Sequence, residues 1–277
     1  MSNTPRMYLS GRSGFGSDLA EAAVDMVGAL GRWRLWTSLA IHDIAARYRG
    51  SMLGPFWITV TMAAMIAGVG TLYSQLFNMG TAEYVPWLAC GLVFWSLFAT
   101  VVTEGCDSFI SSGPIIKQTA LPMLTFIGRM LTRNLITFCH QIVIVVAVVV
   151  YYGIWTKSNP LLCLVGFVLV VVNLTWLALI GGIISARFRD VPQIAGALVQ
   201  VAMFLTPVFW RPDAIKSHRF MLDGNPFYHM LEVTRRPLLG EQVHLNSYLI
   251  LIASAVIGWI VAFLLFARTR RRLVHFL

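Results

Sequence analysis

Charged residues are scarce in this sequence. Asp, Glu, Lys and Arg make up only 12% of its 277 residues, whereas 57% are hydrophobic. Soluble globular domains contain about 25% charged residues. The shortage extends along the whole chain, so it leaves no room for a large soluble domain and predicts several membrane-spanning helices.

Cysteine is also scarce, and no metal-binding or catalytic pattern accompanies it. The four cysteines lie in or beside apolar segments, without a CxxC pair or a histidine at ligand spacing; they are Cys90, Cys106, Cys139 and Cys163. We expect buried free thiols rather than disulfides, and no metal site. No nucleophile–base pair is evident either, so we expect no catalytic residue.

A phosphate-binding GxxxxGK[ST] loop is absent as well, so the sequence shows no ATP site of its own. This absence fits a transport subunit powered by a separate ATPase, a channel, or an ion-coupled carrier. A proton relay usually needs several acids or histidines inside the membrane. His140 is the one titratable residue expected well inside a span, which disfavours the ion-coupled carrier.

The first 31 residues contain no continuous apolar run and do not resemble a cleaved signal peptide. We expect residues 1–31 to form a cytoplasmic tail. Residues 32–54 mix Trp33, Trp36 and Ile44 with Arg and Asp side chains, which predicts an amphipathic helix in the membrane interface. Gly54 and Pro55 should end this helix and turn the chain into the bilayer.

Apolar stretches of about 20 residues or more, the length needed to cross a bilayer, predict six spans. Most Lys and Arg residues between them fall on the side of both chain ends, which predicts cytoplasmic termini and explains the net charge of +9 without nucleic-acid binding. The expected transmembrane domain covers residues 55–267, and a basic cytoplasmic tail follows at 268–277. Its spans are expected at 55–77, 84–104, 121–152, 161–186, 191–209 and 248–267.

Residues 210–247 mix short apolar stretches with Pro and Gly. We expect short re-entrant helices there, because irregular backbone at membrane depth is tolerated only where protein or water surrounds it. The basic residues of this segment (Arg211, Lys216, Arg219, Arg235 and Arg236) are expected to pair with its acids (Asp213, Asp223, Glu232 and Glu241). The expected fold class is thus an all-α membrane protein with six transmembrane helices, an N-terminal interface helix and re-entrant outer helices before the sixth span.

Five short stretches carry a resemblance to a known family. They read RYRGSMLGPFW at 47–57, LP at 121–122, ARFRDVPQI at 186–194, LTPVFW at 205–210 and NPFYHMLEVTRRPLLG at 225–240. In this order and spacing they resemble ABC-2 type permeases that export lipid-linked polysaccharide, such as O-antigen or capsule. The resemblance extends from about residue 36 to the end of the chain.

The resemblance implies a homodimer in the bacterial inner membrane, surrounded by lipid and bound to two ATP-binding-cassette ATPase subunits. ATP and Mg would bind to those partners, so this chain would hold no cofactor. The implied cargo is an undecaprenyl-diphosphate-linked polysaccharide. An ABC-2 exporter of another cargo, such as teichoic acid or a drug, is one alternative; a membrane glycosyltransferase is another, although Glu104 with Asp107 is its only candidate acidic pair.

Two groups of residues are candidates for cargo binding. Arg47, Tyr48 and Arg49 precede the first span, where guanidinium groups could bind the diphosphate of a lipid carrier or simply anchor the chain at the membrane surface. Aromatic side chains near the outer ends of the spans could stack on the C–H faces of sugar rings, or could belong to interfacial belts. These aromatic candidates are Tyr73, Phe77, Phe204, Phe209, Trp210 and Tyr228.

Two further segments are candidates for contact with an ATPase. Residues 105–121 resemble the family's coupling helix, a short cytoplasmic helix bounded by prolines, with an ordinary cytoplasmic loop as the alternative. The turn at 187–190 is a second candidate, with local pairing of Asp190 as its alternative. The residues concerned are Asp107, Ser111, Ser112, Lys117, Arg187, Arg189 and Asp190.

Overall fold

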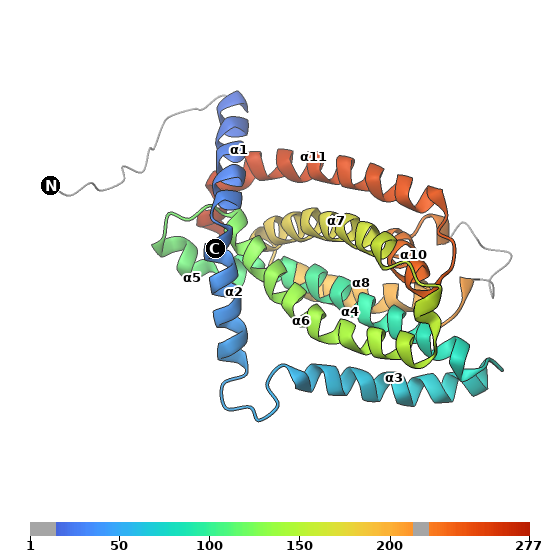
Figure 1. The fold of residues 1–277 in the computed structure, drawn as a ribbon. Helices are drawn as coiled ribbons and strands as arrows, with labels where there is room; N and C mark the ends of the chain where they lie inside the picture. The colour runs from blue at the N-terminus through green and yellow to red at the C-terminus, as the bar shows by residue number, and fades with distance from the viewer. Residues whose placement is uncertain (1–14, 213–221) are drawn as a thin grey trace.

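The computed structural model describes residues 15–212 and 222–277, and the part of the chain that it describes is helical without strands. Two helices, α1 (Phe15–Gly31) and α2 (Trp33–Arg47), lie across one end of a bundle of long helices (Figure 1). We call this end, where the C-terminus also lies, the basal end. The opposite end, which carries α10 (Pro226–Leu239) and the turn between α3 and α4, is the distal end.

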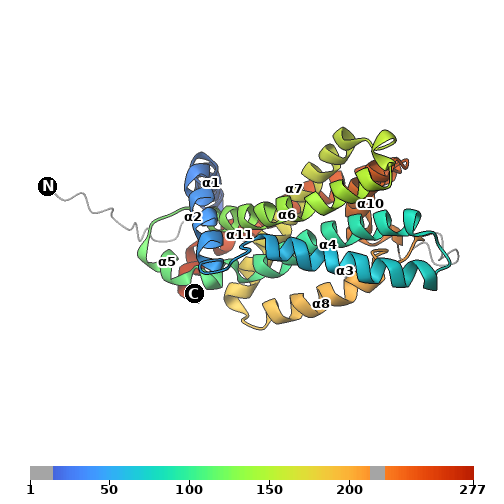
Figure 2. The same cartoon turned by 60° about the horizontal axis from the view of Figure 1, so that its bottom comes forward.

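Among the described residues, five helices are long and apolar enough to cross a membrane. The shorter apolar helix α8 (Val191–Leu205) lies along one edge of the bundle and packs against α4 (Figure 2). The short helices α5 (Gly113–Gln118) and η1 (Ile154–Thr156) connect longer ones. The five long helices are α3 (Phe56–Leu76), α4 (Thr81–Ser111), α6 (Leu124–Tyr151), α7 (Pro160–Arg187) and α11 (Leu245–Phe276).

Helix α4 forms the centre of the bundle, because 78% of its most apolar window is buried. Small residues allow α7 to approach it closely. A Cβ added at Gly105 would lie 2.6 Å from the Cβ of Ala178, and one at Gly181 would lie 2.7 Å from the Sγ of Cys106. Such contacts between small residues are the usual means of packing helices in lipid. Helix α3, by contrast, has only 11% of its apolar window buried.

The predicted spans at 55–77, 121–152 and 161–186 match α3, α6 and α7 within a few residues. Helix α4 extends past the predicted end at residue 104 to Ser111. Helix α11 extends through the predicted basic tail at 268–277 to Phe276. The described structure therefore supports an all-helical membrane protein with five spans of sufficient length.

The fifth predicted span, at 191–209, is shorter than expected. At 15 residues, α8 is about 22 Å long, whereas the hydrocarbon layer is about 30 Å thick. Pro207 explains where the helix stops, because a proline disfavours the helical conformation of the residue before it. Thr206 accordingly has an extended backbone, with φ −92° and ψ 139°.

Helix α1, within the segment expected only as a tail, is attached to the basal end of α11. Arg270 contacts Glu21 at 3.1 Å and Asp25 at 3.0 Å, and Arg271 also pairs with Glu21. The carboxylate of Asp25 is only 3% exposed. The hydrogen bond from Arg271 is the main cause that lowers the pKa of Glu21. These ion pairs join two segments that are far apart in the sequence.

Between α2 and α3 the chain turns sharply, with Gly50 and Gly54 at φ +82° and +53° and Pro55 preceding the first residue of α3. Left-handed conformations of this kind favour glycine.

Three of the cysteines are buried and free as predicted, whereas Cys139 is exposed on the bundle surface, so the expectation of burial was wrong for that thiol.

Candidate functional site

Aromatic side chains from the end of α3, the start of α4, the end of α8 and the segment after α8 meet at the distal end. The ring centroids of Tyr73 and Phe77 lie 5.8 Å apart, and those of Tyr73 and Phe209 lie 6.2 Å apart. Phe204 and Phe209 stack at 6.1 Å, and the indole N–H of Trp210 donates to the Phe204 carbonyl. We call Tyr73, Phe77, Tyr84, Phe204, Phe209 and Trp210 the distal aromatic cluster.

The cluster combines exposed and buried rings. Phe204 is 65% exposed and Phe77 is 43% exposed, whereas Tyr73, Phe209 and Trp210 are half-buried. Tyr84 is fully buried; its hydroxyl donates to the Phe209 carbonyl at 2.7 Å, and its ring lies 5.9 Å from that of Phe77. A partly exposed aromatic surface of this kind offers ring faces to a ligand while buried side chains hold it in place.

The aromatic residues predicted from the sequence match the distal aromatic cluster, except that one member was missed and one residue from elsewhere was included. It missed Tyr84, which reads as one more interfacial tyrosine at the start of a span. It included Tyr228, which the structure places on α10 with 8% exposure. The Tyr228 ring packs edge-on against His229 at 5.2 Å, so Tyr228 is part of the protein interior.

The irregular backbone after α8, residues 206–210, is held by side chains from three directions. Arg235 donates to the Pro207 carbonyl at 2.7 Å, Tyr84 donates to the Phe209 carbonyl, and the Asn225 amide donates to the Thr206 hydroxyl at 2.9 Å. Carbonyl groups at membrane depth require such partners, because lipid cannot supply hydrogen bonds. We call residues 206–210 the distal wedge.

Arg235 is 1% exposed, and its guanidinium carbon lies 3.3 Å from the centre of the Trp87 ring. No carboxylate lies within ion-pair distance of Arg235 in the part of the chain that the structure describes. The expected pairing with acids of the same segment is therefore wrong for Arg235. It is correct for Arg236, which pairs with Glu232 at 3.2 Å and with Glu241 at 4.0 Å.

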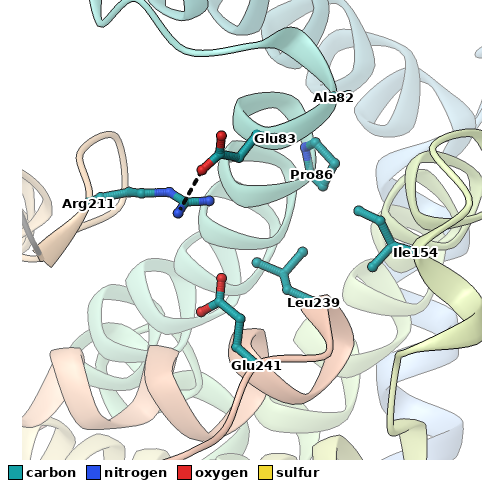
Figure 3. A pocket seen from close by; sticks show the side chains of 7 residues that line it. All are labelled: Ala82, Glu83, Pro86, Ile154, Arg211, Leu239 and Glu241. Atoms are coloured by element: carbon teal, nitrogen blue, oxygen red, sulfur yellow. Dashed lines mark ion pairs between the residues drawn. The ribbon is translucent and has the colours of Figure 1, made fainter.

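A cavity of about 310 Å³ lies next to the distal wedge (Figure 3). Arg211 extends toward Glu83 and pairs with it at 2.9 Å, rather than with an acid of its own segment as predicted. Glu241 lies across the cavity from this pair, and Pro86, Ile154 and Leu239 supply apolar walls. The predicted residues Asp213, Lys216 and Arg219 lie outside the described residues.

At the basal end, the predicted diphosphate-binding residues lie at the end of α2. Arg47 is the last residue of α2, Tyr48 follows as its cap, and Arg49 lies in the turn beyond. Arg47 and Arg49 are exposed and Tyr48 is half-buried. The nearest carboxylate to Arg47 is Glu104, at 3.8 Å.

Behind these residues, a network of charges joins α2 to α4 and α6. Asp43 accepts hydrogen bonds from Arg129 at 2.7 Å and from Arg133 at 3.1 Å, and Arg133 also pairs with Glu104 at 2.7 Å. Burial alone would raise the pKa of Asp43, but the hydrogen bonds and charges of Arg129 and Arg133 outweigh it and hold the pKa below its ordinary value. We call Asp43, Arg47, Glu104, Arg129 and Arg133 the basal ion-pair network.

The two segments predicted to contact an ATPase both lie against the end of α11. Arg189 donates to the Phe276 carbonyl at 3.0 Å, and the Arg187 guanidinium lies 5.6 Å from the Phe276 ring. On the α5 side, a Cβ added at Gly113 would lie 3.7 Å from Leu277. We call α5, residues 187–190 and the end of α11 the basal surface.

The individual coupling candidates differ in position. Lys117 is exposed on α5, Arg187 is exposed at the end of α7, and Arg189 and Asp190 are exposed in the turn between α7 and α8. Asp107 and Ser111 belong to the last turns of α4, so the short helix begins at Gly113 rather than at residue 105. Ser112 is 7% exposed and caps α5, which leaves it little surface for a partner.

Comparison with known proteins decides the family. A family model described as "ABC-2 type transporter" matches residues 34–239, which include every helix from α3 to α10 and most of α2. The chain belongs to the ABC-2 type transporter family. It is therefore a multi-pass integral membrane protein of a transport family.

Two relatives of this ABC-2 protein are similar over most of its length. Both are described as "O-antigen export system permease protein RfbA". The one from Klebsiella pneumoniae is 24% identical over 242 residues, covering 85% of this chain and 92% of the relative. The one from Myxococcus xanthus is 25% identical over 203 residues, covering 71% and 77%.

The family match places all of the predicted site residues within the shared region, because they lie between Arg47 and Tyr228. Helices α1 and α11 lie outside it. The ion pairs between α1 and α11 are thus an addition to the matched ABC-2 region rather than part of it.

Proposed function

We propose that this ABC-2 protein is the membrane permease subunit of an exporter that moves lipid-linked polysaccharide, of the O-antigen or capsule type, across the bacterial inner membrane. The distal aromatic cluster is the observation that carries the cargo assignment. Exposed faces of Phe77 and Phe204 can stack on the apolar faces of sugar rings, and such stacking tolerates many sugars and permits sliding. The printed names of the two RfbA relatives support the same cargo class.

In this proposal the basal end faces the cytoplasm, with both termini on that side. Cytoplasmic loops of membrane proteins carry an excess of Lys and Arg. The basal end carries Lys117, Arg187 and Arg189, and exposed Arg32 and Arg34 lie between α1 and the body of α2. Arg47, Tyr48 and Arg49 would then meet a lipid diphosphate, such as that of an undecaprenyl carrier, in the cytoplasmic leaflet.

A second copy of the chain would complete the transport path. Only 11% of the apolar window of α3 is buried within one chain, and Leu198, Val201 and Phe204 on α8 are more than half exposed. These two apolar helices, which both pack against α4, would face the partner copy and the cargo at a homodimer interface. The distal wedge lies at the end of this path.

The energy for transport would come from two ATP-binding-cassette subunits docked on the basal surface. The ATPase partners would hold ATP and Mg, and this chain would contribute neither a cofactor nor a catalytic residue. Closure of the ATPases would press on α5, which continues directly from α4, the central helix of the bundle. That continuity gives a mechanical route from the basal surface to the distal cluster.

Export by the assembled transporter tests this function. The chain and its ATPase partner are reconstituted together in vesicles, and uptake of lipid-linked glycan and ATP hydrolysis are measured. Phe204→Ala with Phe209→Ala should lower glycan transport at least several-fold while ATP hydrolysis stays at the wild-type level.

The matched control is Ile257→Ala, an apolar position on α11 that is 63% exposed and lies outside the proposed interface, and it should leave transport unchanged. Transport of the glycan that is insensitive to both aromatic substitutions would show that the cluster does not contact the cargo. Transport of an amphipathic drug but no glycan would show a different ABC-2 cargo class.

A further inference from the structure

A chain of buried hydrogen bonds joins α10 to the start of α11. The Nδ1 atom of His229 lies 3.0 Å from the hydroxyl oxygen of Ser247, and that hydroxyl is also hydrogen bonded to a carboxylate oxygen of Glu232. The other ring nitrogen of His229, Nε2, lies 2.9 Å from the backbone carbonyl of Asp223. His229, Glu232 and Ser247 are 3%, 2% and 1% exposed, so water does not complete these contacts.

The number of hydrogen atoms available to these hydrogen bonds determines the protonation state of His229, Ser247 and Glu232 taken together. A carbonyl oxygen can only accept, so Nε2 of His229 carries a proton. A serine hydroxyl has one hydrogen, which it cannot donate to Glu232 and to His229 at once. With neutral His229 and ionised Glu232, one of the two contacts at Ser247 would therefore place lone pairs against each other. A single additional proton removes this conflict.

The additional proton can reside on His229 or on Glu232. If Nδ1 of His229 holds it, the imidazolium donates to Ser247 and Ser247 donates to the Glu232 carboxylate. If Glu232 holds it, the carboxylic acid donates to Ser247 and Ser247 donates to a neutral imidazole. Arg236 lies 3.2 Å from the second Glu232 oxygen, which favours the ionised carboxylate and hence the imidazolium.

We infer that the junction of α10 and α11 holds one proton on His229, balanced by Glu232 through Ser247, and that this proton fastens α10 to α11. The inference concerns the chain itself and does not depend on the cargo. Loss of the proton would break one of the two buried contacts of Ser247 and loosen α10 beside the distal wedge. Protonation on the distal side of the membrane would thereby act on the segment that Asn225 and Arg235 tie to α10.

Other charged groups surround the junction and could contribute to its titration. His244 lies 3.8 Å from Glu232 and is 69% exposed. The titratable and charged groups on the elements packed here are Asp223 before α10, Tyr228, Arg235 and Arg236 on α10, Glu241 and His244 in the following turn, Tyr248 on α11 and Cys163 on α7. Controls must separate His229 from His244 in particular.

Nitrogen NMR of the full chain, labelled at histidine and held in micelles, tests the inference directly. At pH 8.5 the exposed histidines should be neutral, because the ordinary histidine pKa is about 6.5. One imidazolium signal should persist among the six histidines and should be absent from His229→Asn. A wild-type spectrum with no imidazolium at pH 8.5 would overturn the inference, whether or not the His229 variant folds.

Glu232→Gln gives the sharpest comparison. A glutamine amide can donate to Ser247, which can then donate to neutral His229, so every contact of Ser247 is kept without the proton. This variant should convert His229 to the neutral form protonated at Nε2. Glu241→Gln, which removes the other acid near Arg236, and His244→Asn should both leave the imidazolium signal in place. Retention of the imidazolium in Glu232→Gln would contradict the proposed charge balance.

Discussion

The guanidinium carbon of Arg235 lies 3.3 Å from the centre of the Trp87 ring, and the same guanidinium donates to the Pro207 carbonyl. The close stacking of a buried cation on an aromatic ring replaces the carboxylate that such a cation usually needs. It also holds the Arg235 guanidinium in place as a donor to the distal wedge. The distal aromatic cluster is therefore positioned by Arg235 on α10 and Tyr84 on α4, which donate to the carbonyls of Pro207 and Phe209.

The hydroxyl of Tyr84 should contribute measurably to stability. Tyr84→Phe leaves the Phe209 carbonyl without its 2.7 Å donor in a buried place. We expect a loss of about 1–3 kcal/mol in the free energy of unfolding. Thermal unfolding in micelles measures the change. Tyr151→Phe is the control, since Tyr151 is 83% exposed and should be neutral; equal effects of the two substitutions would contradict the role given to Tyr84.

Gly91 allows the distal wedge to approach α4. In Gly91→Ala the new methyl group would lie 2.9 Å from the Val208 carbonyl oxygen and 3.4 Å from Arg235. We expect a destabilisation of about 1–3 kcal/mol and displacement of Phe209. Unfolding experiments compare it with Gly68→Ala, a position on α3 with nothing within 4 Å, which should be neutral or slightly stabilising.

The basal ion-pair network should give the chain an acid-sensitive component of stability. The pKa of Asp43 is lower in the folded chain, so its contribution is complete above the ordinary Asp pKa of about 3.9 and is lost as the pH falls through the lower folded value. Asp43→Asn should cost about 1.5–3 kcal/mol at pH 7.

Unfolding curves of the wild type and Asp43→Asn, recorded from pH 7 down to pH 3, measure this contribution. The difference between the two chains should shrink as the pH falls below about 4, because protonated Asp43 no longer attracts Arg129 and Arg133. A difference that is constant across this range would indicate that the charge of Asp43 is not responsible.

The charges of Arg47 and Arg49 separate substrate capture from simple membrane anchoring. The double substitution Arg47→Glu and Arg49→Glu should weaken binding of vesicles that contain a polyprenyl diphosphate by tenfold or more, about 1.4 kcal/mol. Vesicles with the same total charge but only phosphatidylglycerol are the control. Equal weakening toward both vesicle types would favour anchoring alone.

Contact with an ATPase should depend on the basal surface. Lys117→Glu with Arg187→Glu reverses two exposed charges on α5 and at the end of α7, so the ATPase should no longer copurify while the chain keeps its thermal stability. Lys157→Glu, which reverses an exposed charge next to η1 at the distal end, serves as the control. Loss of the ATPase in the Lys157 variant as well would show a general effect of charge.

Much of the fold follows from local sequence, because long apolar stretches and breaking residues act where they stand. Helices α3, α6 and α7 begin and end close to the limits of their apolar runs. Pro207 also indicates in the sequence that α8 stops early, but the apolar run from 191 to 209 led to the prediction of a longer span. Helix α4 extends beyond its apolar run because polar residues such as Asp107 lie on its exposed side.

The sites depended on contacts that sequence spacing does not reveal. Asp43 and Arg129 lie 86 positions apart, and Tyr84 and the Phe209 carbonyl lie 125 apart. The aromatic residues could be grouped because all were expected near the same ends of their spans. The pairing of Arg235 with Trp87, and the chain from His229 to Glu232, required the relative placement of α4, α10 and α11, which no local pattern specifies.

The attachment of α1 to α11 has a practical consequence for anyone who shortens this protein. Trimming the chain to its family-matched core would discard both helices, and trimming only the first 31 residues would deprive Arg270 of Glu21 and Asp25. The last helix would then carry a cationic end with fewer neutralising neighbours at the membrane surface. A fusion partner or affinity tag is therefore best placed ahead of residue 15, where it leaves the ion pairs between α1 and α11 intact.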